Sequence, residues 1–107
     1  MPAQIRRQGE WMRPVDERIL EHLSERALSS SPRVILSRTE FHDLDVSKIG
    51  VRERLRVLSQ AGLVEPSTPN HGSFELTVWG RMYLDGDVAA DQIVPYPDAR
   101  RAGYVLG

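Results

Sequence analysis

A mainly α fold with a small β-hairpin is predicted by three observations on this chain of 107 residues. Apolar residues recur at helical spacing in separate stretches of the sequence. The stretch 47–61 reads as a helix ended by a glycine, and an apolar strand, a turn-rich loop and a second strand follow it. Serine or threonine stands where it can cap the helices that flank this hairpin. This order of elements is typical of the second half of a winged helix-turn-helix.

The first helix is expected over 14–27. Pro14 suits the first helical position, because the N–H that proline lacks would have no partner there. Asp16 and Glu17 place negative charge in the first turn, where the helix dipole favours it. One apolar stripe is formed by Val15, Ile19, Leu23 and Ala27, with Leu20 beside them.

A short second helix is predicted between Pro32 and Phe41, after the serine-rich breaker that ends at Pro32. The run Arg33–Leu36 also fits a short strand, so the sequence leaves both interpretations open. His42–Asp45 is expected to form the turn that leads to the third helix.

Ser47 is predicted to cap the third helix. Val51, Leu55 and Leu58 recur at spacings of four and three, so they are expected to face the core. Gly62 follows the helix, and glycine readily adopts the left-handed conformation that ends one.

The strands Leu63–Glu65 and Ser73–Leu76 are expected to pair around the loop Pro66–Gly72. Thr77 can then cap a last helix that contains Trp79 and closes at Asp85–Asp87.

The third helix has the two faces that a DNA-reading helix needs. The major groove of B-DNA is roughly 12 Å wide and admits one α-helix. In helix-turn-helix proteins the N-terminal residues of that helix meet the bases. We therefore predict that double-stranded DNA is contacted by Ser47, Lys48, Gly50, Arg52 and Arg56. Arg52 is the first candidate for a bidentate contact to guanine, Lys48 for a base or a phosphate, and Ile49 for a thymine methyl group.

His71, in the loop between the strands, is the remaining predicted DNA contact. The loop contains no lysine or arginine, although such wings usually present a basic tip to the DNA. His71 therefore also fits a solvated turn residue.

Charge is distributed unevenly. The chain has a formal net charge of −1, but residues 33–60 carry six basic and four acidic side chains. Residues 85–98 carry four aspartates and no base. The positive segment coincides with the proposed recognition helix, as phosphate contact would require. The arginine-rich side of this helix can also be simply a solvent-exposed face. Gly50 can be a residue without a function that merely weakens the helix.

Several function classes are excluded by composition and spacing. The absence of cysteine excludes disulfides and thiolate metal sites, and fits a cytoplasmic protein. No apolar run is long enough to cross a membrane. Three separated histidines do not form a metal-binding spacing, and there is no glycine-rich phosphate loop. We therefore predict no metal, no cofactor, no catalytic residue and no enzymatic activity.

Three motifs resemble haloarchaeal winged-helix proteins related to the repressor of the halophage phi-H. They are Trp11–Glu21, the Arg-Leu-Arg-Val-Leu and Gly-Leu-Val pattern of Arg54–Val64, and the Leu-Thr, Gly-Arg and Tyr-Leu pattern of Leu76–Gly86. The middle motif is also similar to the multiple-antibiotic-resistance and ArsR-like winged helices. The resemblance covers about residues 11–86 and implies a winged-helix fold, DNA binding and transcriptional control.

Two departures from the family pattern stand out. Arg13 replaces a small capping residue, and Val78–Trp79 replace polar residues. The apolar pair fits a contact with a second subunit or with the C-terminal tail, or a tryptophan that covers the core of its own domain.

The expected organisation is a flexible arm over 1–10, a winged-helix domain over 11–87 and a tail over 88–107. We predict a homodimeric repressor, because dimers present two recognition helices roughly 34 Å apart to a palindromic site. The alternative is a winged-helix protein–protein interaction module. A positive stripe on the third helix would favour DNA, and an exposed patch at Trp79 would favour a protein partner.

Overall fold

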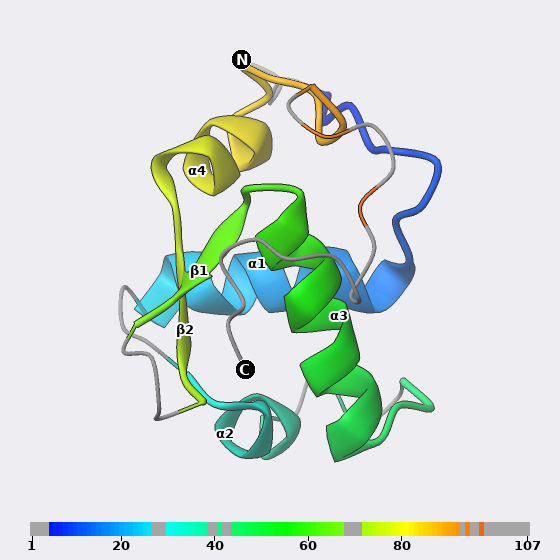
Figure 1. The fold of residues 1–107 in the computed structure, drawn as a ribbon, viewed down its shortest axis with the longest axis vertical. Coiled ribbons are helices and arrows are strands. Elements are labelled where there is room, and N and C mark those ends of the chain that lie inside the picture. The colour runs from blue at the N-terminus through cyan, green and yellow to red at the C-terminus, as the bar shows by residue number, and fades with distance from the viewer. Residues whose placement is uncertain are drawn as a thin grey trace.

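Four helices and one hairpin follow one another in a computed structural model, which describes residues 5–26, 30–38, 41, 44–67, 72–92, 94 and 97. The elements are α1 (Pro14–Arg26), α2 (Pro32–Leu36), α3 (Lys48–Gln60), β1 (Val64–Pro66), β2 (Phe74–Leu76) and α4 (Val78–Leu84). Figure 1 shows α1 across the middle of the molecule, with α3 crossing it and the hairpin beside α3. The helices α2 and α4 lie at opposite ends, so the predicted mainly α architecture with a hairpin is confirmed.

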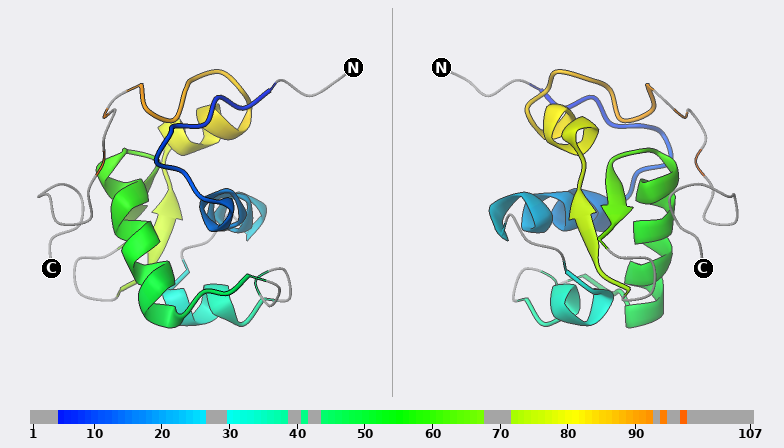
Figure 2. Two further views of the ribbon diagram at one scale, coloured as in Figure 1. Left: turned by 90° about the vertical axis from the view of Figure 1, so that its right-hand side faces the viewer. Right: turned by 60° about the vertical axis from the view of Figure 1, so that its left-hand side comes forward.

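The core lies where α1 and α3 meet the hairpin. The predicted stripes are buried at Val15, Ile19, Leu20 and Leu23 of α1 and at Val51, Leu55 and Leu58 of α3, while Ala27 lies outside the described residues. In the left view of Figure 2, α1 is seen end-on with α3 beside it. The fully buried apolar side chains with the largest volumes are Tyr83, Phe41, Ile19, Leu20, Leu23, Ile35, Leu55 and Leu58.

The stretch after residue 30 forms a helix, so the alternative of a strand over Arg33–Leu36 is wrong. The Ser31 hydroxyl oxygen accepts a hydrogen bond from the Val34 N–H at 3.3 Å, and Pro32 occupies the start of the helix. Cap and proline together favour the first helical turn over an extended backbone.

The hairpin is antiparallel, with Val64 opposite Leu76, Glu65 opposite Glu75 and Pro66 opposite Phe74. The first strand begins one residue later than predicted. Leu63 still belongs to the helix end, because its N–H donates to the Leu58 carbonyl at 3.0 Å after Gly62 turns left-handed with φ 87°. Ser30 adds an isolated antiparallel bridge to Phe74.

Thr77 joins α4 to the end of α3. Its hydroxyl oxygen accepts from the Gly80 N–H at 3.0 Å, and the hydroxyl donates to the Gly62 carbonyl at 2.6 Å. A Cβ at Gly80 would collide with the Leu63 carbonyl oxygen and would lie 2.6 Å from Cδ1 of Leu76. The close approach of α4 to the hairpin therefore requires glycine here.

The described part of the N-terminal segment packs against the domain, so residues 5–10 do not form the free arm that was expected. Arg7 forms a parallel bridge with Ala89, and these two segments lie side by side near α4 (Figure 2). The Arg6 side chain donates to the Leu84 carbonyl at 3.0 Å and to Glu21 at 2.8 Å. The hydrogen bond to Glu21 raises the pKa of Arg6. The structured unit thus extends beyond 11–87 on both sides, because Val88 and Ala90 are also buried.

Candidate nucleic-acid interface

One face of α3 turns away from the core. We call Ile49, Arg52, Glu53 and Arg56 the outer face of α3, because their spacing places them on one side of the helix. Ile49 is 77% exposed, Arg52 and Glu53 are exposed, and Arg56 is half-buried. The opposite face contributes Val51, Leu55 and Leu58 to the core, so the helix is held from behind.

The start of α3 is built as the sequence predicts. The Ser47 hydroxyl oxygen accepts a hydrogen bond from the Gly50 N–H at 3.0 Å. Lys48 is exposed in the first turn. A Cβ at Gly50 would lie 3.1 Å from Cγ2 of Val46 and 3.4 Å from the Ser47 hydroxyl. Gly50 therefore lies against the turn that precedes α3 rather than on the outer face.

The four basic residues of α3 divide into two groups. Arg54 is committed to an ion pair in the interior, whereas Lys48 and Arg52 are exposed, and α3 contains a single acid, Glu53. The side chains of Arg52 and Glu53 make no hydrogen bond or ion pair with any residue that the structure describes. The accessible surface of α3 therefore carries a positive excess and at least one side chain that is available to a ligand.

A buried ion pair joins α3 to α1. Arg54 donates from Nε to Oδ1 of Asp16 at 2.9 Å and from Nη2 to Oδ2 at 2.7 Å. Its Nη2 also donates to the Trp11 carbonyl at 3.2 Å. The Asp16 side chain is fully buried and that of Arg54 is 11% exposed. Asp16 also accepts a hydrogen bond from the Arg13 N–H at 2.8 Å. This bond gives a partner to a backbone N–H just before α1, where the helix itself offers none.

Sequence reasoning missed this ion pair, since it assigned Asp16 to the helix dipole alone and gave Arg54 no buried partner. One signal was available. Arg54 comes three residues after Val51 and four before Leu58, which places it on the apolar side of α3. An arginine at such a position needs a buried partner, because an unpaired charge there would be costly.

The hairpin contributes an acidic stem to the wing. Glu65 stands directly opposite Glu75, and the Ser67 N–H continues the ladder to the Ser73 carbonyl at 2.9 Å. The tip over 68–71 lies outside the described residues, and with it the predicted contact His71. The described part of the wing thus has no feature that attracts phosphate.

The remaining candidates have structural roles or none. Nε2 of His22 lies 3.0 Å from the Ser30 hydroxyl, and the ring meets Phe41 edge-on. Within the described ranges, no three histidine, cysteine or acidic side chains are grouped so that they could hold a metal ion. The helices found there are also too short or too polar to cross a membrane.

An N-terminal helix, a helix-turn-helix and a β-hairpin wing with an exposed basic helix face define a DNA-binding winged helix-turn-helix. The chain belongs to the winged helix-turn-helix phage repressor family, whose model matches residues 5–94. This family is not enzymatic, which agrees with the prediction from sequence.

A solved structure supports this placement. The chain is similar to the PhiH1 repressor-like protein from Haloarcula marismortui, with 30% identity and a TM-score of 0.72. The match covers 88% of this chain and 97% of the other chain. No curated protein matches the sequence. The predicted resemblance to phi-H repressor-like proteins is thereby confirmed.

Proposed function

We propose that this protein is a sequence-specific transcriptional repressor that inserts the outer face of α3 into the major groove of duplex DNA. The observation that supports this most directly is Arg52, an exposed guanidinium without a partner among the described residues, one turn into a helix whose opposite face is anchored in the core. A helix must be fixed from behind if its side chains are to discriminate between bases.

Each residue of this surface has a proposed role. Arg52 donates two hydrogen bonds to a guanine, and Ile49 packs against a thymine methyl group. Lys48 and Arg56 neutralise phosphates, and Ser47 holds the start of the helix against the DNA backbone. Gly50 acts indirectly, because it allows the capping turn to pack closely at the groove. His71 remains a proposed wing contact.

We further propose that the repressor acts as a homodimer in the cytoplasm. Val78 is 76% exposed and Trp79 is 37% exposed, both at the start of α4. Pairing of this apolar surface between two copies would remove it from water. Two copies would then present two α3 helices to a palindromic operator.

A second candidate function is a protein-interaction module. The acidic pair Glu65 and Glu75 on the wing stem favours it, because a DNA-contacting wing usually carries the opposite charge. The exposed Val78 and Trp79 would then bind a different protein.

A selection of bound fragments from a random duplex library, followed by a salt series, tests the proposed function. We expect enrichment of a palindromic motif and a linear fall of log affinity with log salt, since binding releases counterions from the phosphates. Scrambled duplex of the same length is the control. Recovery of fragments without a motif, at every salt concentration, would contradict sequence-specific repression and favour the interaction module.

A further inference from the structure

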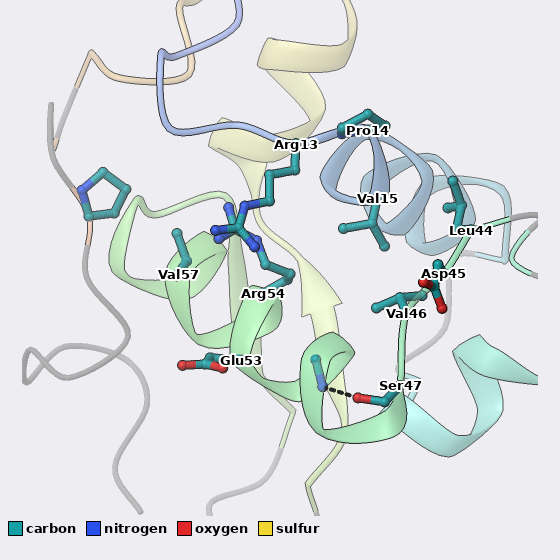
Figure 3. A pocket seen from close by; sticks show the side chains of 12 residues that line it. Arg13, Pro14, Val15, Leu44, Asp45, Val46, Ser47, Glu53, Arg54 and Val57 are labelled. Atoms are coloured by element: carbon teal, nitrogen blue, oxygen red, sulfur yellow. Dashed lines mark hydrogen bonds between the residues drawn. The ribbon is translucent and has the colours of Figure 1, made fainter.

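A pocket of about 560 Å³ opens between the start of α1, the turn before α3 and one flank of α3. Its size falls within the range of roughly 300–1,000 Å³ that small-molecule sites occupy. Its apolar side chains come from four parts of the chain, namely the start of α1, the turn before α3, α3 itself and the segment after α4. They are Pro14, Val15, Leu44, Val46, Val57 and Pro97, and Figure 3 labels all of them except Pro97.

Two arginines, Arg13 and Arg54, reach into this pocket, and in Figure 3 their guanidinium groups extend toward each other from α3 and from the start of α1. Arg13 is exposed, and its side chain makes no hydrogen bond or ion pair with a described residue. Arg54 uses Nε and Nη2 on Asp16 and the Trp11 carbonyl. Its third nitrogen, Nη1, donates to none of the residues that the structure describes.

Guanidinium donors that are left over beside apolar side chains favour a ligand with a charged group and an apolar body. Carboxylates match the fork of an arginine, and charge-assisted hydrogen bonds of this type are stronger than neutral ones. The pocket also contains two acids, Asp45 and Glu53. In Figure 3, Glu53 points away from the two guanidinium groups and Asp45 stands beside Val46 on the opposite side. The positive and apolar parts of the pocket therefore adjoin each other.

We propose that this pocket binds a small organic carboxylate, with its charged group between Arg13 and Arg54 and its apolar body against Val15 and Val57. The ion pair between Asp16 and Arg54 is retained, because the proposed ligand accepts only from Nη1 of Arg54, which the ion pair does not use. The site is distinct from the outer face of α3, although Glu53 borders both.

Occupancy of the pocket weakens DNA binding. This part of the inference rests on the proposed function. Gly50, Glu53 and Val57 line the pocket from α3, so a bound anion adds negative charge beside the surface that must approach phosphates. Because coupling between two binding sites is reciprocal, bound DNA lowers the affinity of the pocket for the anion by the same factor.

Titration of the isotope-labelled protein without DNA tests the site first. The probes are benzoate, its neutral analogue benzyl alcohol and acetate, which lacks the apolar body. We expect saturable NMR shifts at Val15 and Val57 with benzoate, and binding about tenfold weaker for each of the other two probes. Equal binding of benzoate and benzyl alcohol, or no saturable shift with benzoate, would overturn the proposal.

Arg13→Ala provides the matched variant. Its backbone N–H, which bonds Asp16, is kept, and its side chain is exposed, so the fold is not at risk. We expect benzoate to bind about tenfold more weakly to this variant. Arg81→Ala removes an exposed arginine of α4 outside the pocket and should leave binding unchanged. A loss of the same size in both variants would show general anion attraction and overturn the site.

Operator binding with and without saturating benzoate tests the coupling. We expect a lower affinity with benzoate for the parent protein and a smaller effect for Arg13→Ala. An unchanged DNA affinity at saturation would overturn the coupling. Because the titration is performed without DNA, it tests the ligand site independently of the proposed repressor function.

Discussion

Arg52 and Arg54 lie two positions apart on α3 and are used in opposite ways. Arg52 belongs to the outer face and has no partner among the described residues. Arg54 faces α1, where two of its nitrogens are saturated by a fully buried carboxylate and a backbone carbonyl. The difference teaches that the count of basic residues on a recognition helix overstates the charge available to DNA. Arg54 holds α3 against α1 and does not contribute to the charge on the outer face.

The largest expected effect comes from breaking the interior pair. Asp16→Ala leaves the Arg54 guanidinium buried without its carboxylate, so we expect the free energy of unfolding to fall by about 3–5 kcal/mol. Urea denaturation, followed by circular dichroism, measures this loss.

Asp45→Ala, at an exposed carboxylate, is the control for that variant and should change stability little. The double variant Asp16→Leu with Arg54→Met should recover most of the lost stability, because it removes both charges together. A single variant that unfolds at the urea concentration of the parent protein would show that the ion pair contributes nothing.

The second effect concerns discrimination between bases. Arg52→Ala should reduce the preference for the selected motif over scrambled duplex by about 1–3 kcal/mol, because one bidentate base contact is lost. Its free energy of unfolding should be unchanged, since the Arg52 side chain is exposed and has no partner among the residues that the structure describes. Fluorescence anisotropy with both duplexes measures the ratio. A drop of equal size on both duplexes would reassign Arg52 to a phosphate.

The third effect is intermediate and structural. Ser47→Ala removes the cap that accepts the Gly50 N–H, so we expect a loss of about 1 kcal/mol in the free energy of unfolding. Ser47→Asp restores an acceptor and should recover the stability, although its negative charge near phosphate would weaken DNA binding. If Ser47→Ala and Ser47→Asp both have the free energy of unfolding of the parent protein, the cap does not contribute to stability.

The smallest effects separate two neighbours on the outer face. Arg56→Ala should weaken binding to all sequences and reduce the salt slope by about one phosphate contact. Glu53→Ala should act in the opposite direction and strengthen binding to random duplex, because it removes a carboxylate that faces the phosphates. Salt series on both variants test the opposite signs, and a shared sign would place one of the residues off the interface.

Local chemistry explains what the sequence could predict. The caps Ser47 and Thr77 and the helix-ending Gly62 act within a few residues of themselves, so α3, the hairpin and α4 were predictable nearly to the residue. The outer face of α3 followed from helical period alone. Whether Arg52 and its neighbours contact DNA stays a prediction.

The features that were missed depend on residues far apart in the chain. Asp16 and Arg54 are 38 positions apart, and no local pattern indicates which carboxylate an arginine will meet. The packing of residues 5–10 was missed for the same reason, since Arg6 finds its partners on α1 and at the end of α4. Apolar periodicity carries no information about a segment held by polar contacts.

The contact between Arg6 and Leu84 has a consequence for the order in which the molecule can assemble. The two residues are 78 positions apart, and Arg7 pairs with Ala89 still later in the chain. During translation this segment must therefore wait until residues 84–89 have emerged from the ribosome. The Asp16–Arg54 pair closes a loop about half as long, because its residues are 38 positions apart. Among the contacts that the structure describes, closure of the N-terminal segment thus forms the longest loop, and we expect it to be the slowest to form by chain diffusion.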